Sequence, residues 1–289
     1  RYIVPVAAGG GSDMVGRALC ERWAKVLGQS VVVDNIGGGG GVIASQNTAR
    51  SAADGYTLMQ GYVATHGTSP ATRKLPYDAE KDFTPIGRVC VVDYALTTGP
   101  ATPAKTMGEY LQWARDPKNK ASFGSPGAGT IPHFIGQGFT QRTRTDIVHV
   151  PYKGSALTMV DLMGGSVSLG VSPLADAIEH HRNGKVRILA TTGSQRSTAL
   201  KDVPTLKEAG IDLVVDGWYG VYAPAGLPDA QLQALSKALE SAVLKQEDFF
   251  IKNAMRAAPL RPDLLAQLQR AEMAQWEPWV KASGFKAED

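Results

Sequence analysis

Short apolar runs rich in β-branched residues alternate with amphipathic stretches along most of this chain. The first run covers residues 2–4, and apolar positions spaced three or four apart continue from there to Leu27. Gly28 follows the last of these positions, and glycine suits the left-handed conformation that ends many helices. Ser12 or Asp13 is placed to cap the first turn. The pattern predicts a strand, a turn and a helix.

The same strand–turn–helix unit repeats in the following sequence. We predict further strands over residues 31–33, 56–61, 121–123, 147–150, 167–171 and 186–191. We predict helices over residues 42–53, 131–143 and 174–182, and one that ends at residue 163. Strands that alternate with helices in this way favour parallel sheets covered on both faces. The predicted fold class is α/β.

The last part of the chain is mainly helical, with helices expected over 228–245, 248–255 and 263–282. Such terminal helices would pack back on the first sheet. We therefore expect a discontinuous lobe 1 of residues 1–98 plus 221–289, a lobe 2 of residues 99–220, and hinge crossings near 95–100 and 217–224. Glycine-rich loops at the carboxyl ends of strands would then face each other across a ligand cleft.

The composition changes this picture little. Hydrophobic residues make up 43% and charged residues 20%, as in an ordinary globular protein. Thirty lysines and arginines stand against 27 acids and never form a run, which argues against a nucleic-acid partner. No apolar stretch reaches the roughly 18 residues of a membrane span. Cys20 and Cys90 permit one disulfide, although two buried free thiols are the preferred interpretation.

Two glycine clusters, residues 9–11 and 37–41, each lie between a predicted strand and a predicted helix. Glycine lets the backbone approach a ligand closely, and the N–H groups at a helix start can hold a carboxylate. Tight turns without a ligand are the alternative. A dinucleotide fingerprint is a poor fit, because Met14 and Val42 stand where its third glycine is required.

Catalytic chemistry is weakly indicated. There is no nucleophile elbow, yet a spatial triad drawn from the chain's serines and histidines would leave no mark in sequence order, so an α/β hydrolase or transferase stays an alternative. The adjacent His180 and His181 are interpreted as a solvated helix end rather than a metal site. Trp218 and Tyr219 fall on the second hinge crossing, where they would either pack in the core or line the cleft.

A series of motifs, in order, resembles the Bug proteins, the TctC-like extracytoplasmic solute receptors of tripartite tricarboxylate transporters. The most specific is His149-Val150-Pro151-Tyr152-Lys153-Gly154-Ser155. The other matching segments are residues 4–13, 54–58, 75–83, 161–165, 184–187, 202–205 and 223–226. The similarity runs essentially from end to end.

The resemblance implies a two-lobed periplasmic-binding-protein (Venus flytrap) fold of type II-like architecture. It implies a periplasmic, monomeric protein whose signal peptide has been removed. By lobe closure, such a protein captures a small organic acid, aromatic acids and amino acids included, and passes it to membrane permease subunits. No catalytic residue, metal or cofactor is expected. A soluble sensor that delivers its ligand to a signalling partner would share the same clamp.

The loops and the resemblance together give a set of expected ligand-binding residues. Gly11 and Ser12 are expected to donate to a carboxylate, with Ser125 and Thr130 as their counterparts in the other lobe, while Asp13 orients the first loop. The full set is Ala8, Gly11, Ser12, Asp13, Thr65, His66, Ser125, Gly129, Thr130, Ser172, Pro173, Asp176 and Trp218.

The chain departs from the family pattern in its loops. Ala7 and Ala8 stand where relatives often carry two prolines, and Asn35 is followed by Ile36 and five glycines instead of arginine, proline and glycine. The second-lobe loop, residues 125–132, is also less polar than usual. The looser first loops could admit a bulkier or different ligand than is typical of the family, and the less polar second-lobe loop favours a ligand with an apolar or aromatic body.

Overall fold

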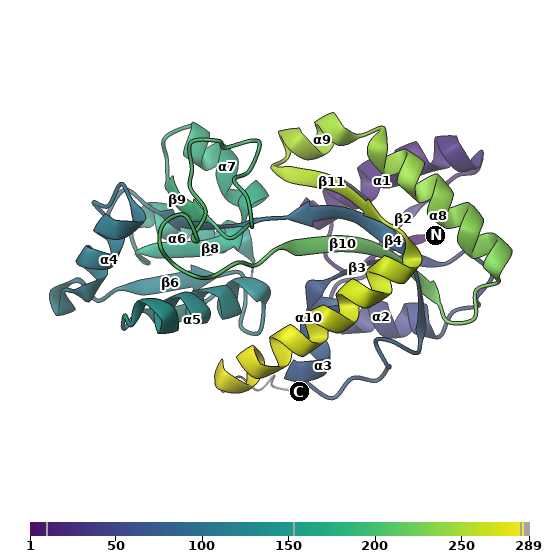
Figure 1. Cartoon of the computed structure of the whole chain (residues 1–289), viewed down its shortest axis with the longest axis horizontal. Helices are drawn as coiled ribbons and strands as arrows, with labels where there is room; N and C mark the ends of the chain where they lie inside the picture. The colour runs from purple at the N-terminus through teal and green to yellow at the C-terminus, as the bar shows by residue number, and fades with distance from the viewer. Residues whose placement is uncertain (10, 153, 284, 286–289) are drawn as a thin grey trace. The chain divides into compact units, whose positions relative to one another are not determined.

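The computed structural model describes residues 1–9, 11–152, 154–283 and 285. Gly10 of the first glycine cluster and Lys153 of the most specific motif lie outside these described residues. The chain folds as two compact units (Figure 1). Unit 1 contains Arg1–Val91, Trp218–Phe250 and the chain from Arg256 onwards, and unit 2 contains Val92–Gly217 and Ile251–Met255.

Unit 1 is built on a mixed sheet of six strands in the order β11-β4-β10-β3-β1-β2. Strand β1, which lies next to the edge strand β2, pairs in parallel with both β2 and β3, whereas β10 pairs antiparallel with β3. The strands are β1 (Tyr2–Val4), β2 (Val33–Asn35), β3 (Leu58–Tyr62), β4 (Phe83–Val92), β10 (Gly217–Pro224) and β11 (Met255–Leu260).

The helices of unit 1 come from both ends of the chain. They are α1 (Gly11–Leu27), η1 (Gly39–Gly41), α2 (Val42–Ala49), the π-helix η2 (Val63–Thr68), α3 (Ser69–Thr72), α8 (Asp229–Leu244), α9 (Glu247–Lys252) and α10 (Pro262–Ser283). The terminal helices α8 and α10 pack against early elements, α8 on α1 and α10 on η2 and α3 (Figure 1).

Unit 2 is built on a mixed sheet of five strands in the order β7-β6-β8-β5-β9. Strand β6 is parallel to β7 and β8, and β5 is antiparallel to β8 and β9. The strands are β5 (Tyr94–Thr98), β6 (Ser122–Ser125), β7 (Val148–Pro151), β8 (Leu169–Pro173) and β9 (Arg187–Thr191).

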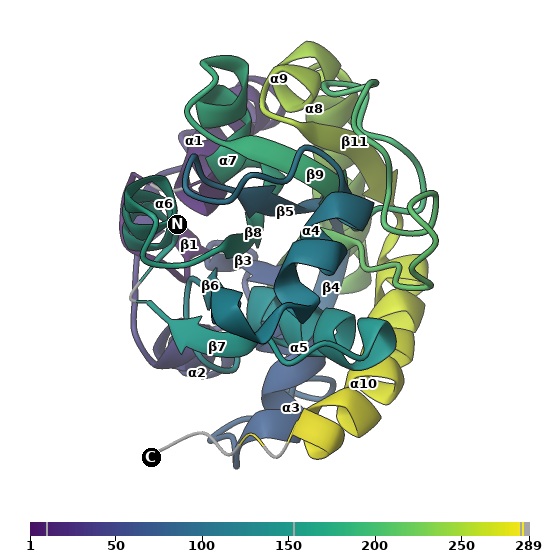
Figure 2. The same cartoon turned by 90° about the vertical axis from the view of Figure 1, so that its left-hand side faces the viewer.

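Helices cover both faces of the unit 2 sheet. They are α4 (Met107–Arg115), η3 (Pro117–Asn119), α5 (Ile131–Thr143), α6 (Ser155–Gly164) and α7 (Leu174–Arg182). Helix α5 lies on one face, and α6 and α7 lie side by side on the other (Figure 2). Helix α5 connects β6 to β7, whereas α6 connects β7 to β8 and α7 connects β8 to β9, so the chain crosses the sheet in opposite directions. Because such crossovers are right-handed, the two directions place their helices on opposite faces of the sheet.

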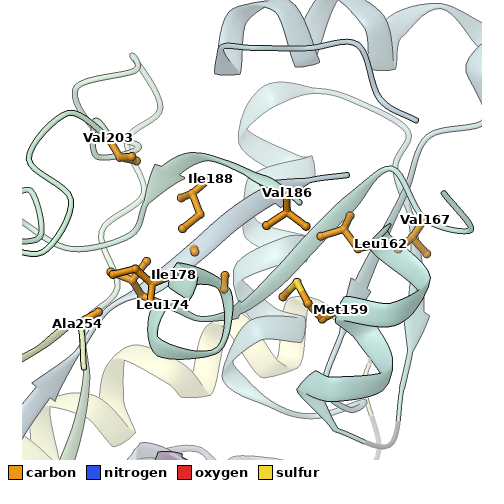
Figure 3. Packing of buried hydrophobic residues seen from close by; sticks show 11 residues of the cluster. Met159, Leu162, Val167, Leu174, Ile178, Val186, Ile188, Val203 and Ala254 are labelled. Atoms are coloured by element: carbon orange, nitrogen blue, oxygen red, sulfur yellow. The ribbon is translucent and has the colours of Figure 1, made fainter. Parts of the chain in front are cut away.

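Buried aliphatic side chains join α6 and α7 to the sheet of unit 2. Met159 and Leu162 on α6 and Leu174 and Ile178 on α7 are at most 3% exposed, and they meet Ile188 of β9 (Figure 3). Removing this apolar surface from water stabilises the unit by roughly 25 cal/mol per Å². The cluster also fixes where the two helices begin, which matters for the site.

The predicted α/β class is confirmed, and the helices expected over 131–143 and 174–182 have those bounds in the structure. The expected all-parallel sheets are wrong, because both sheets are mixed. The strand expected over 31–33 lies instead at Val33–Asn35, with Val32 65% exposed. This strand is an edge strand, so a run of valines there need not be buried.

Two predicted helices are shorter than expected. The helix expected over 42–53 ends at Ala49. The one expected over 248–255 ends at Lys252, and strand β11 follows where no strand was predicted. Helical and strand patterns are hard to separate in so short a run. Among the described residues, no helix combines the length and the apolar character that a membrane crossing needs.

Candidate functional site

Three neighbouring parallel strands of unit 1, β3, β1 and β2, end at the same edge of the sheet. The segments that leave this edge lead into α1, into η1 and α2, and into η2. They contain both glycine clusters of the sequence. The carboxyl edge of parallel strands is where open α/β sheets bind ligands, so this edge is the candidate site of unit 1.

Asp13 joins the segments that leave β1 and β2. Its carboxylate accepts hydrogen bonds from the Gly9 N–H (2.9 Å), from Arg17 Nε (3.0 Å) and from Asn35 Nδ2 (2.9 Å). Asn35 also donates to the Val6 carbonyl oxygen. Burial alone would raise the pKa of Asp13, but these bonds lower it below its ordinary value. The carboxylate orients the loop that leads into α1, and all of its hydrogen-bond donors belong to unit 1.

Ser12 lies in the first turn of α1 and contacts a polar side chain from β3. Gln60, which is fully buried, donates through Nε2 to the Ser12 carbonyl oxygen (3.0 Å) and to Ser12 Oγ (2.7 Å). Gly11 opens the same turn, and Ala8 before it is exposed. The helix begins at Gly11, so Ser12 and Asp13 lie inside the first turn and not at the cap position expected for them.

The second glycine cluster contains four consecutive residues with positive φ, from Gly38 to Gly41. Only glycine adopts such a run without strain. At Gly41 the tertiary packing adds a second constraint, because a Cβ there would lie 2.5 Å from Thr65 Cγ2 and 3.0 Å from Tyr62 Oη. The segment after β2 therefore packs directly on η2, the segment after β3.

Thr65 and His66 were expected to line the ligand site, but both side chains are fully buried in η2. Their Oγ1 and Nδ1 atoms lie 2.8 Å apart, and the His66 ring stacks on Tyr222 with centroids 3.9 Å apart. Burial lowers the pKa of His66 to about 3. In this structure the two residues support the loop from within unit 1 and offer no polar atom to solvent.

Unit 2 repeats the arrangement on its own sheet. The neighbouring parallel strands β7, β6 and β8 end at Pro151, Ser125 and Pro173, and α6, α5 and α7 begin shortly after those ends. Figure 2 shows the three helices around this sheet. Each helix start carries unpaired N–H groups and a partial positive charge. Three of them at one sheet edge favour an anion.

The hydroxyls of Ser125 and Thr130 are used inside the loop between β6 and α5. Thr130 Oγ1 donates to the Gly127 carbonyl oxygen (2.7 Å), and Ser125 Oγ lies 3.1 Å from the same oxygen and 2.8 Å from His149 Nε2. Each hydroxyl has one hydrogen, so neither retains one for a ligand. The geometry does not support the donor role expected for them. Within the described chain, the N–H groups of Gly127 and Ala128 make no hydrogen bond and are better placed to donate.

His149 and His133 form a stacked pair beneath this loop, with ring centroids 4.0 Å apart. His133 Nδ1 accepts from the N–H of Gly129, which has a positive φ. Burial lowers the pKa of each histidine to about 4, and for His149 the neighbouring His133 lowers it further. Ser125 and His149 resemble a nucleophile and its base, but Ser125 is fully buried, and a second histidine, His133, stacks on His149 where a triad requires a hydrogen-bonded acid.

The remaining expected residues are divided between the two units. Ser172 is fully buried near the end of β8, and Pro173 caps α7. Asp176 lies in the first turn of α7, where burial raises its pKa although a hydrogen bond from Ser155 lowers it. Trp218 belongs to unit 1 and is 2% exposed, with no hydrogen-bond partner for Nε1 among the described residues. It is a packing residue in this structure.

The sequence analysis did not predict the supporting roles of Gln60, Asn35 and His149, and it named His149 only as the first residue of the most specific motif. Gln60 could have been found, because it is a polar residue within an apolar strand, Leu58–Tyr62. A buried polar side chain requires partners, and here its partner is Ser12. Asn35 stands just before the second glycine cluster, but no pattern in the sequence indicates that it contacts Asp13.

A hollow of unit 2, about 550 Å³, is lined by Lys105, His181 and Arg187 among others and lies at the amino end of β9. It is therefore at the edge opposite the three helix starts. His181 is half-buried in the last turn of α7 and accepts a hydrogen bond from the Ile188 N–H there. The described residues contain no cluster of ligands suited to a metal ion, and Cys20 and Cys90 are buried free thiols.

Similar proteins share this architecture. The protein BugT of Bordetella pertussis is 31% identical over 99% of this chain and 89% of its own length. The solved structure of an R. palustris protein with adipate is 29% identical with a TM-score of 0.89, over 99% of this chain and 97% of that one. MatC from Rhodopseudomonas palustris with bound malate is 29% identical with a TM-score of 0.83, over 96% and 97%. The periplasmic binding protein BugD is 30% identical with a TM-score of 0.87, over 99% and 98%.

Two α/β units, each with helix starts gathered at one sheet edge, define a substrate-binding protein of the two-lobed periplasmic class. The family model described as the tripartite tricarboxylate transporter family receptor, TctC, matches residues 15–285. The chain belongs to this family. Its relatives are substrate-binding proteins and not enzymes, which confirms the non-enzymatic expectation and removes the hydrolase alternative.

Proposed function

We propose that this protein captures a small aliphatic dicarboxylate and delivers it to the membrane subunits of a tripartite tricarboxylate transporter. One observation carries the proposal. In unit 2, three helices of 13, 10 and 9 residues begin at the carboxyl ends of three neighbouring parallel strands. Helix starts offer N–H donors and partial positive charge, which suit a carboxylate.

Unit 1 supplies a second set of donors of the same kind. The first turn of α1 contains the Gly11 and Ser12 N–H groups and the Ser12 hydroxyl, and Asp13 holds the preceding loop through Gly9. A ligand with two carboxylates would use one set of donors in each unit. Closure of the two units on such a ligand is part of the proposal, and small-angle X-ray scattering with and without ligand tests it through the radius of gyration.

The ligand class is suggested by similar proteins, two of which were solved with adipate and with malate. These acids differ in length and polarity but share two carboxylates. The apolar residues of the unit 2 loop, Pro126 and Ala128, favour the longer, less hydroxylated acid. We therefore expect adipate to bind more tightly than malate. The family and its periplasmic members also support a periplasmic location and a transporter partner.

Isothermal titration of the purified, ligand-free protein with malate, succinate, glutarate and adipate tests the ligand class. Binding to the native state alone raises stability by RT ln(1 + [L]/Kd), or about 4 kcal/mol when the free ligand is a thousandfold above Kd, so thermal unfolding provides a second readout. Ser12→Ala should weaken binding, and Ser30→Ala, a change at an exposed serine of unit 1, should not. No binding of any of the four acids would reject the proposal. Loss of dicarboxylate uptake on deleting the gene in the native host tests the transporter partnership.

A further inference from the structure

Two buried polar side chains lie beneath the first turn of α1. Gln60 on β3 and Tyr2 on β1 are both fully buried, and the Tyr2 hydroxyl donates to Gln60 Oε1 over 3.2 Å. Buried polar groups are costly unless they are hydrogen-bonded, so this pair needs a structural or functional reason. Among the described residues, the hydrogen bonds of this pair towards the candidate site go to Ser12.

The direction of these hydrogen bonds follows from the chemistry of their atoms. The Ser12 carbonyl oxygen, 3.0 Å from Gln60, can only accept, so the amide nitrogen of Gln60 must face Ser12 and the amide oxygen must face Tyr2. The second N–H of the same nitrogen points to Ser12 Oγ at 2.7 Å. Ser12 Oγ is therefore an acceptor in this bond, and its own hydrogen is left to donate elsewhere.

Gly16 is the position at which the backbone of α1 leaves room for Tyr2 and Gln60. A Cβ on Gly16 would lie 2.7 Å from Val4 Cγ2 and 3.3 Å from Gln60 Oε1. Glycine weakens the interior of a helix relative to alanine, so its presence here is explained by the close approach of α1 to β1 and β3. The helix start, the glutamine and the tyrosine therefore form one packed unit.

We propose that Gln60, held by Tyr2, is a positioning residue that makes the Ser12 hydroxyl an obligatory hydrogen-bond donor to the ligand's carboxylate. This inference rests on the proposed function, since it assigns the role of one residue in the same site. A carboxylate oxygen only accepts and satisfies such a donor. Both oxygens of a carboxylate accept, whereas only the one oxygen of a carboxamide does, so we expect the site to favour an acid over its amide.

The test is a double-mutant cycle measured with adipate by isothermal titration. Gln60→Met removes the amide while keeping an unbranched side chain of similar length, and Ser12→Ala removes the hydroxyl. We expect each single change to weaken binding roughly tenfold, and Gln60→Met to cost less than twofold once Ser12 is alanine, because the two act through one hydrogen bond. Wild type should also prefer adipate to its monoamide, and Gln60→Met should reduce that preference.

Gln269→Met is the matched control, because Gln269 is also buried in unit 1 and donates to the Ala79 carbonyl oxygen away from the site. It should leave the affinity for adipate unchanged. Equal losses from Gln60→Met in the wild-type and Ser12→Ala backgrounds would overturn the inference and leave the proposed function intact. Failure of the wild-type protein to bind any dicarboxylate would reject both.

A readout without ligand keeps the inference testable if Gln60→Met does not fold. In wild-type protein, both side-chain amide protons of Gln60 should exchange slowly with solvent in ¹⁵N-resolved NMR spectra, because both are hydrogen-bonded and buried. Tyr2→Phe should speed their exchange by removing the bond to Oε1. Rapid exchange of either proton in the wild type would contradict the geometry on which the inference depends.

Discussion

The Asp13 carboxylate accepts a 2.9 Å hydrogen bond from the backbone N–H of Gly9, which lies four residues earlier in the chain. The bond closes the loop between β1 and α1 before any ligand arrives. Arg17 and Asn35 hold the same carboxylate from two other directions. The loop is therefore preorganised, so ligand binding does not carry the free-energy cost of ordering it.

Asp13→Asn should destabilise the protein by about 1–3 kcal/mol, because a buried acceptor of three hydrogen bonds becomes partly a donor. The lowered pKa of Asp13 gives the sign of the pH effect. Its contribution is present above the ordinary pKa of an aspartate and is lost as the pH falls through the lowered value of the folded state. Urea unfolding at neutral and acid pH measures both effects.

Asp34→Asn is the control for this prediction. Asp34 pairs with Arg1 on the surface, where both side chains are 41% exposed, and such pairs contribute at most about 1 kcal/mol. An equal loss of stability for Asp34→Asn and Asp13→Asn would mean that the buried hydrogen bonds of Asp13 contribute no more than a surface ion pair.

Gly41→Ala should destabilise unit 1 and weaken ligand binding. Its φ of +95° is unfavourable for alanine, and the added Cβ would lie 2.5 Å from Thr65 Cγ2. We expect a loss of roughly 2–4 kcal/mol in thermal or urea unfolding. Gly108→Ala on α4 is the comparison, because no atom lies within 4 Å of the added Cβ. That change should be neutral or stabilise by up to about 1 kcal/mol, and similar losses for both variants would refute the packing argument.

The sequence analysis predicted most elements because local patterns determine them. The bounds of α5 and α7 follow from a capping threonine before Ile131, a proline before Leu174 and the helical spacing after each. Strand β11 and the edge strand β2 were missed or misplaced because their form depends on sheet neighbours distant in sequence. Pairing of that kind leaves no local signal.

The candidate site was predictable as a set of loops but not as a set of donors. Both glycine clusters lie at the carboxyl edge of the unit 1 sheet, between strands and helices. The expectation that Ser125 and Thr130 donate to the ligand stays a prediction, and in this structure both hydroxyls bond within their loop, to Gly127. The direction in which a hydroxyl points depends on atoms brought together by folding, and for Ser12 it depends on Gln60, 48 residues away.

Both cysteines should be unreactive in the native protein. Cys20 is 2% exposed and Cys90 is fully buried, and burial raises the pKa of each thiol to about 12. Only the thiolate reacts, so an aromatic disulfide reagent at pH 8 should label neither cysteine in folded protein and both in denaturant. Rapid labelling of native protein would show that Cys20 or Cys90 is accessible. Failure to label the denatured protein would indicate a disulfide.

Acid should destabilise the fold through three neutral histidines. Burial lowers the pKa of His66 to about 3 and those of His133 and His149 to about 4, whereas an unperturbed histidine titrates at 6.5. Below pH 6.5 the unfolded chain takes up protons that the folded chain refuses, so the free energy of unfolding falls with falling pH until the folded-state values are reached. Thermal unfolding between pH 7.5 and pH 5 measures this effect above the range in which most carboxylates titrate.

His149→Gln should reduce this pH dependence. Glutamine can still donate an N–H to Ser125, so the hydrogen bond at 2.8 Å can be kept while one titrating group is removed. We expect lower stability at pH 7.5, because the stacking on Phe123 and His133 is lost, but a smaller further loss on acidification to pH 5. The difference between the variant and the wild type in the stability lost from pH 7.5 to pH 5 gives the contribution of His149. An unchanged slope would show that His149 has the same pKa in the folded and the unfolded chain, and would contradict the lowering of its pKa by burial.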